Sequence, residues 1–142
     1  MTEPLANAAP LPILTPENTP FWTGGEDGQL MIARCAACLR YHHPPGPICP
    51  HCLSLEVAPE PVSGKGIVAS FTVNHQPWLP GMRVPFTIGL VELAEDPSIR
   101  ITTNLVNQPV EAAFIGQAVR VVFERHEDVW LPLFEPDDGN AA

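Results

Sequence analysis

Short runs of alternating apolar and polar residues fill the sequence from residue 64 onward, and this period of two predicts β-strands. In the run GIVASFTVNH, the apolar residues that share one face are Ile67, Ala69, Phe71 and Val73. In the run PFTIGLVEL, they are Phe86, Ile88 and Leu90. Three further runs, SIRITTNLV, QAVRVVFE and VWLPLF, complete five predicted strands. Five strands within about 70 residues favour a small closed barrel of the OB type, since a sandwich needs about seven.

Two connections between these strands are distinctive in sequence. The long segment NHQPWLPGMRVP holds three prolines together with Trp78, Met82 and Arg83. Because loops carry function more often than the scaffold beneath them, this segment is a candidate binding loop. The second connection, from Val110 to Ile115, predicts one helical turn before Gly116.

The N-terminal part of the chain predicts a tail followed by a short helical segment. Residues 1–14 are rich in alanine and proline and lack periodicity, so we expect a flexible tail. In the stretch TPENTPFWTGG, Thr15 and Thr19 each precede a proline, as an N-cap precedes proline at the first helical position. One or two short helices are therefore expected within residues 15–27, ended by Gly24 and Gly25.

Phe21 and Trp22 stand in the middle of this helical segment. One interpretation is that both rings anchor the helix to the body of the protein, as aromatic residues commonly do. The other is that they form a surface for a partner protein. The sequence favours anchoring and leaves both interpretations open.

Composition places the chain among globular proteins that act away from membranes. Apolar residues make up 45% and charged residues 16%, and no apolar run approaches the roughly 20 residues that a membrane helix requires. Prolines at 10, 12, 16 and 20 interrupt the N-terminal stretch, which lacks the basic start and apolar core of a secretory signal. We therefore expect a cytoplasmic protein, in which structural disulfides are rare.

The charge balance argues against nucleic acid as a partner. Sixteen acidic residues outnumber seven basic ones, Lys65 is the one lysine, and the formal net charge is −9. A nucleic-acid-binding face needs many cations to displace counterions from phosphates. The six arginines still suffice for a local patch that grips one anionic ligand, because a guanidinium binds phosphate through two hydrogen bonds.

All four cysteines lie in RCAACLRYHHPPGPICPHCL, as two Cys-x-x-Cys pairs separated by ten residues. Two such knuckles facing one another place four thiolates around one ion, which predicts a zinc site or, less often, an iron site. The predicted ligands are Cys35, Cys38, Cys49 and Cys52. Because four thiolates fill the tetrahedron and reduce the Lewis acidity of the metal, the site is expected to be structural rather than catalytic.

Other candidate catalytic groups are few. His42 and His43 lie between the knuckles and His51 lies inside the second, and we expect them to support the site rather than ligate the metal. No nucleophile-elbow, phosphate-loop or His-Glu-x-x-His motif occurs, and the metal leaves no free cysteine as a nucleophile.

Together these patterns predict a mainly β fold. Its parts are a flexible tail (1–14), a short helical segment (15–27), a rubredoxin-like zinc ribbon (28–62), a five-stranded OB-fold barrel (63–136) and a second flexible tail (137–142). The ribbon begins with the strand-like run GQLMIARC, which leads into the first cysteine pair.

The order of motifs resembles the DUF35 family over roughly residues 20–135. The resemblance rests on Phe-Trp before the ribbon, HPP between the knuckles, SGKG at the start of the barrel, and the later runs VPFTIGLVEL and GQAVRVVFE. The chain departs from the family where Leu39 and Leu53 follow the knuckles, because the family often has glycine there. The local turns at these two positions are therefore expected to differ.

What the resemblance implies is a non-catalytic accessory subunit, in a hetero-oligomer with a thiolase-like catalytic subunit that acts on acyl-CoA. By analogy, the complex is an aldolase that cleaves a carbon–carbon bond of a CoA thioester such as a steroid side chain. A thiolase, acyltransferase or hydroxymethylglutaryl-CoA synthase assembly is the alternative. The candidate CoA contacts are Arg34, Arg40 and Arg83, and the candidate partner contacts are Phe21, Trp22 and Trp78.

Two other classes of function remain as competing hypotheses. A zinc ribbon and an OB barrel also occur in nucleic-acid-binding proteins, although the net charge of −9 argues against that role. A self-sufficient hydrolase would need an open position on the metal, which four cysteine ligands do not leave.

Overall fold

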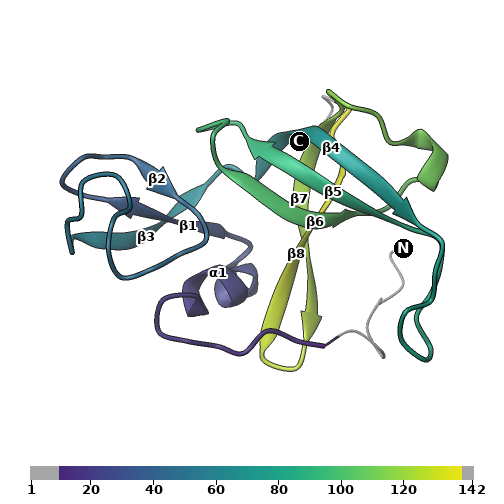
Figure 1. Cartoon of the computed structure of the whole chain (residues 1–142), viewed down its shortest axis with the longest axis horizontal. Helices are drawn as coiled ribbons and strands as arrows, with labels where there is room; N and C mark the ends of the chain where they lie inside the picture. The colour runs from purple at the N-terminus through teal and green to yellow at the C-terminus, as the bar shows by residue number, and fades with distance from the viewer. Residues whose placement is uncertain (1–9, 139–142) are drawn as a thin grey trace.

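The computed structural model describes residues 10–138, so most of the two predicted tails lies outside the described residues. Two β-structures follow one another along the chain, and a short helical segment lies between them (Figure 1). The elements in chain order are α1 (Thr19–Thr23), η1 (Gly24–Asp27), β1 (Leu30–Cys35), β2 (Tyr41–His42), β3 (Val57–Val62), β4 (Lys65–Asn74), β5 (Phe86–Leu93), β6 (Arg100–Leu105), η2 (Val110–Ala112), β7 (Ala118–His126) and β8 (Val129–Pro136). The prediction of a mainly β protein with a short N-terminal helix is confirmed.

The first β-structure is an antiparallel sheet in the order β2-β1-β3. Its central strand, β1, pairs with β3 over its whole length, from Leu30 opposite Val62 to Cys35 opposite Val57. The partner on the other side, β2, is only two residues long and follows the first knuckle. This small sheet holds both cysteine pairs at one end, as Figure 1 shows for the loops that leave β1 and enter β3.

The second β-structure is a closed five-stranded barrel in the order β4-β5-β6-β8-β7. Its neighbours are antiparallel except for β6 and β8, which run parallel and meet at Leu105 and Phe134. Closure gives every strand of the barrel two neighbours. The predicted five-stranded OB barrel is therefore confirmed, and the predicted helical turn after residue 110 is present as η2.

The face predicted for β4 is correct at Phe71 but wrong at Ile67. The register against β5 shifts between Val68 and Ser70, which marks a β-bulge at Ala69. The extra residue reverses the alternation, so Val68 is fully buried while Ile67 is 42% exposed.

The face predicted for β5 is also inverted. The residues that face the core are Thr87, Gly89, Val91 and Leu93, while Phe86, Ile88 and Leu90 lie half-buried on the outer face. Glycine at 89 is required because the Leu105 side chain fills the space beside it, and a Cβ added there would lie 2.7 Å from Leu105 Cγ. Both faces of β5 are thus largely apolar, so alternation alone does not identify the inner one.

The helical segment lies against both β-structures, and its predicted limits need correction. Asn18, not Thr19, is the N-cap of α1, while Thr15 begins a preceding turn in which its Oγ1 accepts a hydrogen bond from the Asn18 N–H. Gly24 and Gly25 do not end the helical segment. They begin η1, which ends at Gly28 in the left-handed conformation that glycine adopts without strain.

Close packing explains the glycine at position 25. A Cβ added to Gly25 would lie 2.5 Å from Trp130 Cβ and 2.6 Å from the Phe123 ring, so only glycine lets η1 rest on β7 and β8. The core then runs continuously from Phe21 of α1 and Leu30 of β1 into the barrel. No helix within residues 10–138 is long and apolar enough to cross a membrane.

Candidate metal centre

The two Cys-x-x-Cys knuckles fold in the same way. In the first, the Leu39 N–H donates to the Cys35 carbonyl at 2.8 Å, and in the second the Leu53 N–H donates to the Cys49 carbonyl at 2.9 Å. The Cys35 and Cys49 N–H groups in turn bond to carbonyls five residues downstream, at 3.0 and 2.9 Å. Each knuckle is therefore a closed turn that presents two sulfurs to the other.

The sulfurs form a compact group that fits a tetrahedral metal. All four Sγ atoms lie within 4.8 Å of one another, with Cys35 and Cys52 3.6 Å apart and Cys38 and Cys49 3.7 Å apart. Zn–S bonds of about 2.3 Å in a tetrahedron require S···S distances of about 3.8 Å. Cys35, Cys38, Cys49 and Cys52, the four residues predicted from spacing, are thus positioned for metal binding.

Ionisation of the four thiols also favours binding of a cation. The Cys38 N–H donates to Cys35 Sγ, and this hydrogen bond is the main reason that the pKa of Cys35 falls to about 6. At Cys52 a backbone hydrogen bond from Ser54 favours the thiolate, but desolvation and the three neighbouring sulfurs together raise the pKa to about 12. The sulfurs therefore resist ionising together, and a divalent metal removes that conflict.

The histidines around the knuckles do not join the four-sulfur group. The His51 backbone N–H donates to Cys49 Sγ at 3.4 Å, and its Nε2 lies 3.3 Å from the Tyr41 carbonyl oxygen, so His51 contacts the site from outside the four-sulfur group. His42 is buried within the sheet, with 5% exposed, rather than at the surface. His43 packs its ring against Phe21 at 4.8 Å.

Leu39 and Leu53 adopt the turn that the glycines of the family would allow. Their φ angles are +67° and +65°, which lie in the left-handed region that glycine adopts without strain. This conformation costs a residue with a Cβ about 1–2 kcal/mol. Both side chains point into solvent, with 62% and 75% exposed, so burial within the chain does little to offset this cost.

The three candidate CoA arginines do not converge. Arg34 is engaged in the ribbon, where its Nε donates to the Leu39 carbonyl at 2.9 Å, its Nη1 lies 3.4 Å from a Glu60 oxygen, and its guanidinium covers the Tyr41 ring. Arg40 is exposed in the same ribbon. Arg83 lies in the loop between β4 and β5, at the opposite end of the molecule from the ribbon (Figure 1).

The three aromatic candidates for partner contact differ in how much of each side chain is exposed. Phe21 is only 6% exposed, and its edge-to-face contact with Trp22 has a centroid distance of 4.8 Å. This burial supports anchoring for Phe21 and leaves it little surface for a partner. Trp22 is half-buried, whereas Trp78 is 72% exposed, held by a hydrogen bond from its Nε1 to Asn74 Oδ1.

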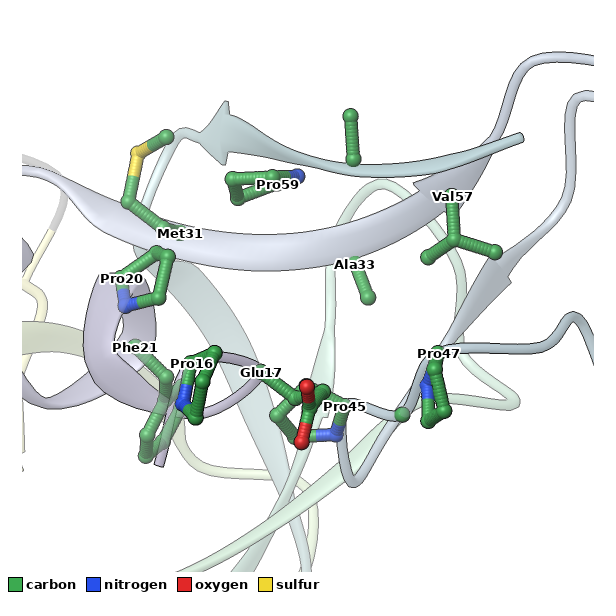
Figure 2. A pocket seen from close by; sticks show the side chains of 12 residues that line it. Pro16, Glu17, Pro20, Phe21, Met31, Ala33, Pro45, Pro47, Val57 and Pro59 are labelled. Atoms are coloured by element: carbon green, nitrogen blue, oxygen red, sulfur yellow. The ribbon is translucent and has the colours of Figure 1, made fainter. Parts of the chain in front are cut away.

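A pocket that sequence patterns did not predict lies between α1 and the ribbon sheet. It has a volume of about 320 Å³, and Figure 2 shows prolines 16, 20, 45, 47 and 59 lining it together with Glu17. A second hollow of about 510 Å³ shares Phe21 and Glu17 and extends to Trp22 and Arg100. The repeated prolines of TPENTP and HPPGP were the available signal, because proline supplies rigid walls without N–H donors.

Two family models match consecutive parts of this chain. Residues 22–58 match the family described as the rubredoxin-like zinc ribbon domain of ChsH2, and residues 59–124 match its C-terminal OB-fold domain. A DUF35 domain-containing scaffold protein of Methanocaldococcus jannaschii is 33% identical over 112 residues, which cover 78% of this chain and 74% of that protein. This chain belongs to the DUF35 family. The resemblance stated from the motifs is thereby confirmed.

Solved structures agree with this assignment. This chain superposes on a chain of the structure "Ltp2-ChsH2(DUF35) aldolase" with a TM-score of 0.79 and 35% identity, covering 89% of this chain and 98% of that one. A Sulfolobus solfataricus DUF35 protein of unknown function, 15% identical with a TM-score of 0.62, shares the fold.

Two longer relatives are named as hydratase subunits. A probable enoyl-CoA hydratase alpha subunit of Thermomonospora curvata is 37% identical over 89% of this chain. A 3-oxo-4,17-pregnadiene-20-carboxyl-CoA hydratase alpha subunit of Mycobacterium tuberculosis is 38% identical over 83% of it. The DUF35 chain spans only 40% and 37% of these two proteins, so it corresponds to one part of each.

Proposed function

We propose that this DUF35 protein is a non-catalytic, zinc-binding subunit that binds a thiolase-fold catalytic subunit and helps to hold its acyl-CoA substrate. The observation that carries the proposal is the match over 98% of the DUF35 chain in the Ltp2-ChsH2(DUF35) aldolase. In that structure a chain of this fold accompanies a second, named component. A hetero-oligomer in the cytoplasm is the corresponding state for this chain.

The chemistry of the metal centre supports an accessory role. Four sulfurs at tetrahedral spacing leave a bound zinc ion no open position for water or substrate. Within residues 10–138, this is also the one cluster of at least three histidine, cysteine or acidic side chains with metal-binding geometry. Zinc bound here would hold the two knuckles together and supply folding free energy rather than Lewis acidity.

The reaction of the complex is proposed to be carbon–carbon cleavage. In a retro-aldol reaction, the hydroxyl of a β-hydroxyacyl-CoA loses its proton and becomes a ketone, while the Cα–Cβ bond breaks and Cα gains a proton in the released acyl-CoA. This chain matches nearly the whole length of one chain in the aldolase structure, but it spans only about two-fifths of the hydratase alpha subunits. A thiolase, acyltransferase or hydroxymethylglutaryl-CoA synthase assembly is the alternative.

The β4–β5 loop is the proposed contribution of the barrel to CoA binding. It carries both Arg83 and the exposed Trp78, so one loop offers a cation for a phosphate and an aromatic ring for the adenine. Arg40 is exposed in the ribbon and remains a candidate for a second contact. Arg34 is the weakest candidate, because Glu60, Tyr41 and the Leu39 carbonyl already engage its guanidinium.

The test is co-purification from the native host followed by an assay. Affinity-tagged DUF35 protein should recover a thiolase-fold protein in a fixed ratio, and the recovered complex should convert a β-hydroxyacyl-CoA into a ketone and a shorter acyl-CoA. The DUF35 chain alone should give no product. Recovery of no thiolase-fold protein would contradict the proposal, and acyl transfer without cleavage would favour the alternative.

A further inference from the structure

The barrel is closed between β6 and β8 by a single residue pair. These strands meet at Leu105 and Phe134, and no other residue of β6 pairs with β8 in the described part of the chain. A hollow of about 150 Å³ lies between the two strands, and Phe21 and Trp22 of α1 form part of its wall. The first residues of β6 therefore have β5 on one side and a hollow on the other.

The register of β6 determines which of its backbone groups face that hollow. The Leu93 N–H donates to the Ile99 carbonyl at 3.1 Å, so these opposite residues form a hydrogen-bonded pair. Such pairs alternate with non-hydrogen-bonded pairs along an antiparallel ladder, and Leu90 opposite Thr102 belongs to the second kind. The Thr102 N–H and C=O therefore point away from β5. Within residues 10–138, no hydrogen bond to either group occurs.

Three hollows share Thr102 in their linings. The first lies between β6 and β8, and the second is the hollow of about 510 Å³ beside α1. The third, of about 200 Å³, lies over the outer face of β4, β5 and β6, where Ser70 and Thr72 lie opposite Leu90 and Ile88. Thr102 thus stands within a run of hollows that extends from the barrel face to the ribbon.

The hollow beside α1 suits the uncharged end of a ligand. Its walls are mostly aromatic rings and prolines. The Arg100 Nε and Nη2 both donate to Glu92 Oε2, at 3.2 and 2.9 Å. Burial lowers the pKa of His43 to about 4, so its ring is neutral at pH 7, and Glu17 adds a carboxylate to the lining. A phosphate therefore finds no ready cation in this lining.

The other end of β6 lies beside the β4–β5 loop, the loop that carries Trp78 and Arg83. Thr87 at the start of β5 lies opposite Leu105, and this loop is at the far end of the molecule from the ribbon (Figure 1). The strand from Leu105 back to Arg100 spans roughly 17 Å. An extended pantetheine arm spans a similar distance, and each of its two secondary amides offers an N–H and a C=O that complement an open strand backbone.

We propose that an acyl-CoA lies along β6, with its nucleotide at the β4–β5 loop, a pantetheine amide bound to the Thr102 N–H and C=O, and its acyl group in the hollow beside α1. This inference rests on the proposed function for the identity of the ligand. It adds the direction in which the ligand lies and the backbone groups that hold its arm.

A peptide strand also carries amides, but the length of the open backbone favours the pantetheine arm. Within residues 10–138, Arg100 and Thr102 are the residues of β6 whose N–H and C=O both lack a partner. Two such residues match an arm with two amides, whereas an added strand of about five residues needs a longer open edge.

The test assembles variants of this chain with the co-purified catalytic subunit and measures inhibition by the two halves of CoA. In Thr102→Pro the outward N–H is lost while the ladder to β5 keeps its hydrogen bonds. Inhibition by free pantetheine should weaken at least tenfold, and inhibition by adenosine 3′,5′-bisphosphate should stay within twofold of the wild type. Arg83→Ala should give the reverse pattern. Ile115→Ala, outside all three hollows and 70% exposed, is the control and should change neither value.

Amide hydrogen exchange in the wild-type complex gives an independent measurement, which also decides if Thr102→Pro fails to fold. The Thr102 N–H lies outside the ladder to β5, so it should exchange rapidly without ligand and at least tenfold more slowly with saturating pantetheine. The amides of Ile101 and Thr103 bond to β5 and should be protected in both states.

Three outcomes would overturn the inference. Unchanged pantetheine inhibition in a folded Thr102→Pro complex, with no slowing of exchange at residue 102, would exclude the binding of the arm by β6, while a nucleotide effect of Arg83→Ala would still support the proposed function. Slow exchange at residue 102 with the catalytic subunit alone would assign the open backbone to a peptide of that subunit. Equal affinity of the catalytic subunit for acyl-CoA with and without this chain would remove the proposed function, and this inference with it.

Discussion

The imidazole of His43 packs against the ring of Phe21, with 4.8 Å between the ring centroids. This contact joins α1 to the segment between the two knuckles, two parts of the chain that are well separated in sequence. His43 Nδ1 is buried without a hydrogen-bond partner among the described residues. Burial is the main reason that the pKa of His43 falls to about 4 from its ordinary value of 6.5.

The His43 contact predicts a loss of stability in mild acid. Below pH 6.5 the unfolded chain takes up a proton at His43, while the folded chain does so only near pH 4. The contribution of His43 is therefore fully present above pH 6.5, and it is lost as pH falls toward 4. The full effect on the free energy of unfolding is about 3 kcal/mol.

A comparison of variants isolates this effect from loss of the metal in acid. His43→Phe keeps a ring against Phe21 and should flatten the decline in unfolding free energy between pH 6.5 and 4, relative to the wild type. Denaturant unfolding at a series of pH values gives the comparison. His75→Phe, in the exposed β4–β5 loop, is the matched control and should decline as the wild type does. Equal slopes for all three proteins would contradict the prediction.

Gly25 predicts a second effect on stability. In Gly25→Ala the new Cβ meets Trp130 and Phe123 at 2.5–2.6 Å, so η1 must move away from the barrel. We expect the free energy of unfolding to fall by about 1–3 kcal/mol, as overpacking usually produces. Gly46→Ala is the control, because nothing lies within 4 Å of its Cβ position, and it should be neutral or stabilise by up to about 1 kcal/mol. Equal melting temperatures for the two variants would contradict this assignment.

The metal ligands could be predicted from sequence because each cysteine pair is a local motif whose spacing already determines its geometry. The strand faces could not be predicted as reliably. The bulge at Ala69 reverses which residues of β4 face the core, and no residue type in the sequence marks it. Strand β5 is apolar on both faces, so its inner face cannot be read from alternation. The pocket beside Phe21 was missed because it depends on prolines from three separate segments.

The reversal of the inward-facing residues in β4 can be tested by substitution. Val68→Ala removes two methyl groups from a fully buried side chain and should lower the free energy of unfolding by about 2 kcal/mol. Ile67→Ala acts on a side chain that is 42% exposed and should cost only about 0.5 kcal/mol. Denaturant unfolding of the two variants measures both losses. If Ile67 faced the core, as strict alternation predicts, Ile67→Ala would cost more unfolding free energy than Val68→Ala.

Metal removal tests the role of the four-sulfur site. The purified protein should contain one zinc ion per chain, measured by plasma mass spectrometry, and chelation or Cys38→Ser should remove it. Structural zinc contributes about 10–16 kcal/mol in small zinc-dependent peptides, far more than the few buried residues of this ribbon can replace. In amide NMR spectra, we expect signals from residues 30–62 to lose dispersion, while signals from the closed barrel remain dispersed.

His51→Ala is the matched control for this prediction. The hydrogen bond from residue 51 to Cys49 Sγ comes from the backbone, so alanine preserves it and the variant should retain one zinc ion per chain. Loss of zinc in His51→Ala would instead indicate histidine ligation and an open metal position. For Cys38→Ser, less partner should be recovered, but activity per assembled catalytic subunit should match the wild type. A lower activity per assembled complex would assign the metal a part in the chemistry, which four sulfur ligands otherwise exclude.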